Sequence, residues 1–127
     1  MAMPSSVVPT PRLIGLVMAG GLAGAAVRVA IAAVVPSDGF PWSTVAVNLA
    51  GAALIGWLLP RVRGRRHSMA FLVLGIGGTA TTFSALTIDA MRLLEADRVA
   101  AVLGYLGLSV IGGFFLASAA IRVSRSA

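Results

Sequence analysis

The sequence predicts an all-α membrane protein with four transmembrane helices, the third of which is broken. Three observations lead to this fold class. Apolar residues make up 58% of the 127 residues and charged residues 11%, with a mean hydropathy of +0.97, which leaves too little polar surface for a water-soluble domain. The apolar residues gather in four long runs. The third run contains a cluster of glycine, threonine and serine residues, which weakens a helix.

The four apolar runs cover about residues 13–35, 43–59, 69–91 and 99–123. At a rise of about 1.5 Å per residue each can cross a hydrocarbon core of about 30 Å, the second run only just. The connections between them are short and contain proline, glycine or charged residues. We therefore expect one transmembrane domain over residues 1–127 and no separate soluble domain.

The charged residues predict how the spans are oriented. With four spans, both termini and the second loop share one side of the membrane. That side carries seven of the ten arginines: Arg12, Arg61, Arg63, Arg65, Arg66, Arg122 and Arg125. The other side carries Arg92 and Arg98 together with all four acidic residues: Asp38, Asp89, Glu95 and Asp97. The positive-inside rule then places both termini in the cytoplasm, in a multi-pass protein of the cell membrane. The net charge of +6 indicates contact with anionic lipid headgroups rather than nucleic acid.

In the first span, Gly20, Gly24 and Arg28 lie four residues apart and share one helix face. Small residues at this spacing allow two helix backbones to approach closely. A cation inside a bilayer costs about 2.5–3.5 kcal/mol on insertion scales. Either the Arg28 side chain extends to the headgroups, or it is a buried anchor that supplies a positive field for anions.

The second and fourth spans each carry a polar line at helical spacing. Asn48 lies on a face of small residues in the second span, and its amide could form an interhelical hydrogen bond or donate N–H groups to an anion. Tyr105 and Ser109 lie four residues apart in the fourth span and form a possible line of hydroxyl groups.

The third span contains the segment GIGGTATTFS, residues 75–84. A helix broken here would expose N–H groups on one half, which suit an anion, and carbonyl groups on the other, which suit a cation. Such a break is tolerated only inside protein or beside a water-filled path. A glycine kink that holds no ion is the alternative. Phe83, within this segment, could pack in the core or turn its positive ring edge to an anion.

Catalysis has little support in the sequence, and we expect no enzyme. The only histidine, His67, lies in the arginine-rich second loop, the acidic residues lie in or near the loops, and there are no cysteines. Neither a nucleophile–base pair nor a metal-ligating cluster emerges.

Three motifs give the chain a resemblance to a known family, the fluoride-specific ion channels (Fluc, also called CrcB). The segments GGLAGAAVR at residues 20–28, STVAVNLAGAALIG at 43–56 and GIGGTATTFSAL at 75–86 are similar to that family's motifs in order and spacing. The likeness covers nearly the whole chain. It departs at Ala80, where many members have phenylalanine or leucine, and at Leu86, where many have phenylalanine.

The resemblance implies an antiparallel dimer of four-helix subunits, with two fluoride pathways along the subunit interface and one structural, untransported Na⁺ at the centre. The carbonyl groups of Gly75 and Gly78 would hold the sodium ion. Asn48, Thr82, Phe83 and Ser84 would meet fluoride, and Arg28 would lie near a vestibule. The implied function is passive fluoride efflux, which lowers cytoplasmic fluoride and confers fluoride resistance.

The partner subunit is left open between two possibilities. The seven-to-two arginine bias favours a fixed orientation and pairing with an oppositely oriented paralogue, whereas a homodimer would have to tolerate that bias. Two other functions are the alternatives to a channel. A small multidrug-type exporter needs a membrane-embedded carboxylate, and the first span has none. A membrane assembly protein without transport activity is the other alternative.

Overall fold

The computed structural model describes residues 8–127, so the part of the predicted 1–127 domain that covers residues 1–7 lies outside it. Helices joined by short connections make up the described chain, which contains no strand. Its elements are α1 (Pro11–Val34), α2 (Trp42–Val62), α3 (Arg66–Ser68), η2 (Met69–Gly77), α4 (Gly78–Ala80), α5 (Phe83–Glu95), α6 (Val99–Gly107), η3 (Leu108–Gly112) and α7 (Gly113–Ser126). The segments η2 and η3 are π-helical. Within residues 8–127 the elements together form four helices that are long and apolar enough to cross a membrane: Pro11–Val34, Trp42–Val62, Arg66–Glu95 and Val99–Ser126.

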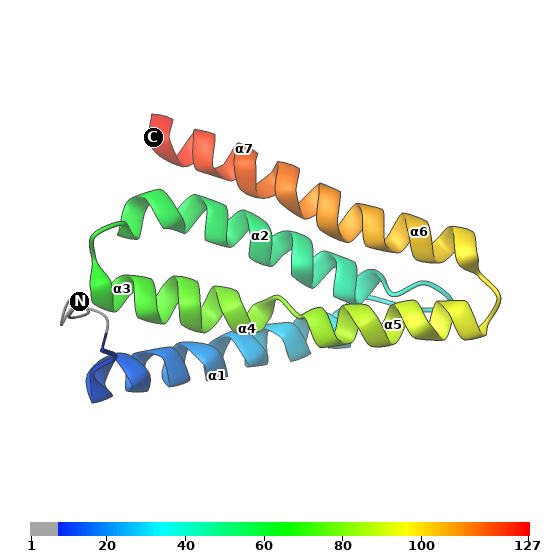
Figure 1. The fold of residues 1–127 in the computed structure, drawn as a ribbon, viewed down its shortest axis with the longest axis horizontal. Coiled ribbons are helices and arrows are strands. Elements are labelled where there is room, and N and C mark those ends of the chain that lie inside the picture. The colour runs from blue at the N-terminus through cyan, green and yellow to red at the C-terminus, as the bar shows by residue number, and fades with distance from the viewer. Residues whose placement is uncertain (1–7) are drawn as a thin grey trace, which may run out of the picture.

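The predicted fold class is confirmed. The four long helices run up and down in sequence, so the start of α1, the α2–α3 turn and the C-terminus gather at one end of the subunit (Figure 1). We call this the termini end, and the end with the α1–α2 and α5–α6 loops the loop end. The third helix is broken, because a short non-helical segment separates α4 from α5 (Figure 1).

Local sequence explains where the helices begin and turn. Thr10 caps α1 by accepting a hydrogen bond from the Leu13 N–H at 3.4 Å, and Pro11 follows at the first helical position, where its missing N–H costs nothing. Gly64, with a φ of +84°, makes the tight turn after α2. L-residues with a side chain rarely adopt this conformation.

Small residues join the helices in two tight pairs. Gly20 of α1 lies against η2 so closely that a Cβ added at Gly75 would fall 2.8 Å from the Gly20 Cα. Gly56 of α2 meets α7 in the same way, since an added Cβ would lie 2.9 Å from the Ala117 Cα. The pairs α1–η2 and α2–α7 therefore pack backbone against backbone, the packing that small-residue faces permit in lipid.

The largest buried side chain is that of Tyr105, which is fully covered near the loop end. Its ring meets Phe40 edge to face at a centroid distance of 5.8 Å. Val45, Leu86 and Leu93 complete the same apolar cluster between α2, α5 and α6. This cluster holds α5 in position on the loop side of the break.

Candidate functional site at the helix break

The third helix is interrupted at Thr81 and Thr82, both of which have extended backbone conformations. The first half ends where the Thr81 N–H donates to the Gly77 carbonyl at 3.2 Å. The second half begins when the Thr82 hydroxyl accepts a hydrogen bond from the Ala85 N–H at 3.3 Å, which is an ordinary N-cap. The break therefore follows the glycine cluster rather than lying within it.

The side chain of Asn48 holds the break open. Its Oδ1 accepts a hydrogen bond from the Thr82 N–H at 2.9 Å, and its Nδ2 donates to the Thr82 carbonyl at 3.5 Å. The Asn48 amide thus makes the hydrogen bonds to the Thr82 backbone that residues of an unbroken helix would make. The predicted interhelical hydrogen bond is present. The Nδ2 group carries two hydrogens, and this long contact uses only one of them. The other hydrogen is therefore available to a ligand.

The break releases backbone carbonyl groups. In an unbroken helix the Gly78 carbonyl would accept from the Thr82 N–H, which instead donates to Asn48. Gly78 is exposed on the subunit surface. Gly75 is buried against α1, and its carbonyl accepts the Thr79 hydroxyl at 2.7 Å. Of the two predicted sodium donors, Gly78 has the more accessible oxygen.

A cavity of about 220 Å³ opens beside the break. Its lining brings together four of the predicted pore residues, which are Asn48, Thr82, Phe83 and Ser109. The Ser109 hydroxyl is buried and has no hydrogen-bond partner within residues 8–127. A buried, unpaired hydroxyl that faces a cavity is poised to bind a ligand.

Ser84 and Tyr105, the remaining predicted pore residues, lie outside this lining, and Phe83 borders the cavity from the exposed side. Phe83 is 80% exposed and turns away from the subunit core. The exposed Ser84 hydroxyl lies 3.2 Å from that of Thr82, so these two form a hydroxyl pair at the start of α5. Tyr105 does not line the cavity and lies in the apolar cluster. Ala80, the departure from the family pattern, is buried at 6% exposure.

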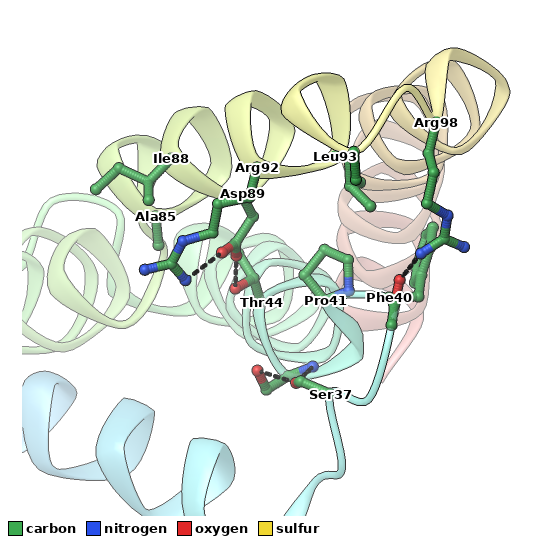
Figure 2. Close-up of a pocket in the computed structure, with 13 residues that line it drawn as sticks. Ser37, Phe40, Pro41, Thr44, Ala85, Ile88, Asp89, Arg92, Leu93 and Arg98 are labelled. Carbon is green, nitrogen blue, oxygen red and sulfur yellow. Dashed lines mark hydrogen bonds and ion pairs between the residues drawn. The ribbon is translucent and has the colours of Figure 1, made fainter.

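Sequence reasoning missed a polar cluster at the loop end (Figure 2). Asp89 of α5 accepts hydrogen bonds from the Thr44 hydroxyl at 2.7 Å and from the Tyr105 hydroxyl at 3.4 Å. Arg92 forms an ion pair with the same carboxylate at 3.6 Å. Thr44 is four residues before Asn48, and this shared helix face was the available signal.

Three neighbouring crevices lie between this cluster and the break. The first, of about 600 Å³, lies at the loop end and includes Thr44, Asp89 and Arg92 in its lining (Figure 2). The second, of about 220 Å³, is lined by Arg28, Thr44 and Thr82 among others. Because Thr44 lines the first two and Thr82 lines the second and the break cavity, the crevices form a series from the loop end to the break.

Comparison with known proteins identifies the family of this chain. The family model described as CrcB-like protein, Camphor Resistance (CrcB), matches residues 15–121. The chain belongs to the CrcB family. The resemblance predicted from its three motifs is thus confirmed.

Relatives of this CrcB-family chain include curated proteins named fluoride-specific ion channel FluC. The protein from Stutzerimonas stutzeri is 37% identical over 127 residues, which cover 90% of this chain and 98% of the relative. That from Pseudomonas putida strain F1 is 39% identical over 121 residues, covering 89% and 97%. FluC 1 of Cutibacterium acnes is 37% identical over 124 residues, covering 91% and 87%. The family is one of membrane ion channels rather than enzymes, and the four apolar helices indicate a multi-pass membrane protein.

Proposed function

We propose that this protein is a fluoride-selective channel that allows passive fluoride efflux across the cell membrane. The observation that carries this proposal is the series of crevices ending at the break, where one cavity is lined by Asn48 and by Ser109, whose hydroxyl has no partner among residues 8–127. The relatives named as fluoride-specific channels support fluoride as the permeant ion.

The chemistry of the lining suits a small, strongly hydrated anion. A pore must replace its water shell with hydrogen-bond donors, and it must bind weakly enough for the ion to leave. The break cavity offers hydroxyl and amide donors and the positive edge of the Phe83 ring. Asp89 and the arginines lie outside its lining, so no full charge is present in the cavity to repel or trap the ion.

The antiparallel dimer is part of the proposal. Irregular backbone at membrane depth is tolerated only where protein or water covers it, and Gly78, Phe83 and Ser84 are exposed beside the break in the single subunit. A second subunit would cover this face. It would be the same chain or an oppositely oriented paralogue, and the seven-to-two arginine bias favours the paralogue.

We further propose that a structural sodium ion is held by backbone carbonyl groups at the break. A hard cation prefers oxygen ligands, and the Gly78 carbonyl has lost its helical donor. The Gly75 carbonyl would be a second ligand only if it binds the sodium ion while it also accepts the Thr79 hydroxyl. A bound cation would lower the cost of bringing an anion to this depth. Both termini would face the cytoplasm, by the arginine distribution.

A flux assay with the purified chain in liposomes tests the proposal. Liposomes loaded with potassium fluoride should release fluoride to an ion-selective electrode when a potassium ionophore is added, and liposomes loaded with chloride should release no chloride. Reconstitution from detergent does not impose one orientation, so the chain alone can form antiparallel pairs. Absence of fluoride release, from this chain alone and from its mixture with an oppositely biased relative, would exclude channel function and leave a non-transporting assembly role.

Crosslinking in native membranes separates the two dimers. A dimer found only together with a second gene product supports the paralogue. A stable and conducting particle made from this chain alone would rule out obligate pairing.

A further inference from the structure

The termini end of the subunit carries an excess of arginine that no acidic residue offsets. Its seven arginines contrast with the four acidic residues, which lie in the α1–α2 loop, in α5 and in the α5–α6 loop. Within residues 8–127 the one ion pair joins Asp89 and Arg92, towards the loop end. Within residues 8–127 no acidic side chain therefore neutralises the positive charge of the termini end.

At this end, the last turn of α2, the start of η2 and the last turns of α7 enclose a crevice of about 630 Å³. Its lining consists of Leu59, Pro60, Arg63, Met69, Ile121 and Arg125. Two guanidinium groups from distant parts of the sequence thus share one crevice with four apolar side chains. This combination of cationic and apolar groups matches an amphipathic anion.

Among residues 8–127 the side chains of the two arginines of the crevice have no partner, nor do those of Arg65 and Arg122 outside it, whereas those of Arg61 and Arg66 do. Arg61 donates to the Ser124 hydroxyl and to the Trp57 carbonyl, and it lies 3.8 Å from the centre of the Trp57 ring. Arg66 donates to the backbone carbonyl of Val8. Arg63 and Arg125 therefore keep their donors available for a ligand.

We propose that this crevice binds the phosphate of an anionic phospholipid from the membrane leaflet at the termini end. Guanidinium groups bind phosphate oxygens in bidentate geometry, and basic crevices between transmembrane helices suit anionic headgroups. The crevice lies where α2 and α7 end, the level at which the headgroups of a bilayer meet the spans. The proposal is independent of fluoride conduction.

A second, mostly apolar crevice supplies a place for an acyl chain of the same lipid. It has a volume of about 390 Å³, lies between α1 and η2, and reaches from Pro9 and Arg66 to Leu74. Met69 lines both crevices, so they are neighbours. The lipid would thus extend from two arginines at the membrane surface along an apolar groove towards its centre.

Native mass spectrometry of the detergent-purified chain, titrated with phosphatidylglycerol, tests this site. We expect discrete bound lipid, and the double variant Arg63→Gln/Arg125→Gln should bind it about thirtyfold more weakly, as the loss of two cations near a headgroup predicts. The matched control is Arg65→Gln/Arg122→Gln, which removes the same charge from the same loop and helix outside the crevice. This control should bind close to the wild-type affinity.

Leu59→Trp is a second test that keeps every charge. Leu59 is partly exposed and lines the crevice, so the larger ring should fill the space and weaken lipid binding while the helical circular dichroism spectrum is retained. Three results would overturn the proposal: an equal loss in both arginine pairs, equal binding of phosphatidylcholine, or displacement of the lipid by inorganic phosphate, which would indicate a site for the free anion.

Discussion

Replacing Asn48 by aspartate should stop fluoride conduction while it preserves the helix break. The carboxylate keeps an oxygen where Oδ1 accepts the Thr82 N–H at 2.9 Å. It removes the Nδ2 donor, whose contact with the Thr82 carbonyl at 3.5 Å is weak in any case. At a pH low enough to protonate the new carboxyl group, the folding free energy should change little, because the bond that holds the break is retained. The ionised form should cost about 2.5–3.5 kcal/mol, as a charge inside a bilayer does.

The effect on flux follows from charge. A carboxylate about 4 Å from a passing anion repels it by about 4 kcal/mol at an effective dielectric constant of about 20. This slows passage by about a thousandfold. The loss should deepen as the pH rises, since more of the new carboxyl group is then ionised.

Asn48→Ala provides the comparison, because it removes both the donor and the acceptor. Thr82 is only 9% exposed, so an N–H left without its acceptor should cost about 1–3 kcal/mol. Fluoride release from liposomes measures conduction, and thermal unfolding in detergent measures stability. The reasoning is refuted if the aspartate variant conducts at the wild-type rate at high pH, or if both variants lose the same stability at low pH.

Three further predictions concern side-chain contacts, backbone packing and the proposed cation. Ser109→Ala should slow fluoride release about tenfold without lowering stability, because the hydroxyl has no partner within residues 8–127. Ser124→Ala is the control: it loses a 2.6 Å hydrogen bond to a backbone carbonyl, so it should lower stability and leave fluoride release unchanged. Gly75→Ala should cost about 1–3 kcal/mol, since its Cβ would lie 2.8 Å from the Gly20 Cα, whereas Gly104→Ala meets nothing within 4 Å and should gain up to about 1 kcal/mol; equal thermal midpoints would contradict this. Replacing sodium by a large organic cation should lower the thermal midpoint, because an ion at a hundred times its Kd stabilises by about 2.7 kcal/mol, and an unchanged midpoint would argue against a sodium site.

The sequence predicted the fold class well because membrane spans depend on length and composition, which are local properties. The position of the break depends on a contact between distant residues. The glycines at 75, 77 and 78 suggested a weak helix, but the backbone remains helical through all three. The helix ends where Asn48, 34 residues earlier in the chain, binds Thr82. Gly75 serves close packing against α1 instead.

In the candidate site, too, local features could be predicted from the sequence, whereas contacts between distant residues could not. Helical spacing correctly indicated the packing faces of α1 and α2. Grouping Tyr105 with Ser109 by spacing did not predict their different surroundings, since η3, a π-helical segment, begins between them and changes the register of the helix faces. The cluster of Thr44, Tyr105 and Asp89 joins three separate spans. The spacing of Thr44 and Asn48 indicated a polar face on α2, but it could not reveal which residues of the other spans meet that face.

The two backbone-tight helix pairs limit how the subunit can move. Gly20 against η2 and Gly56 against Ala117 leave no space for sliding within either pair, because a densely packed contact shifts as a unit. Any internal displacement of the subunit would therefore move one helix pair as a rigid unit relative to the other, and a side chain larger than hydrogen at Gly20 or Gly56 would have to push a whole helix away from its partner.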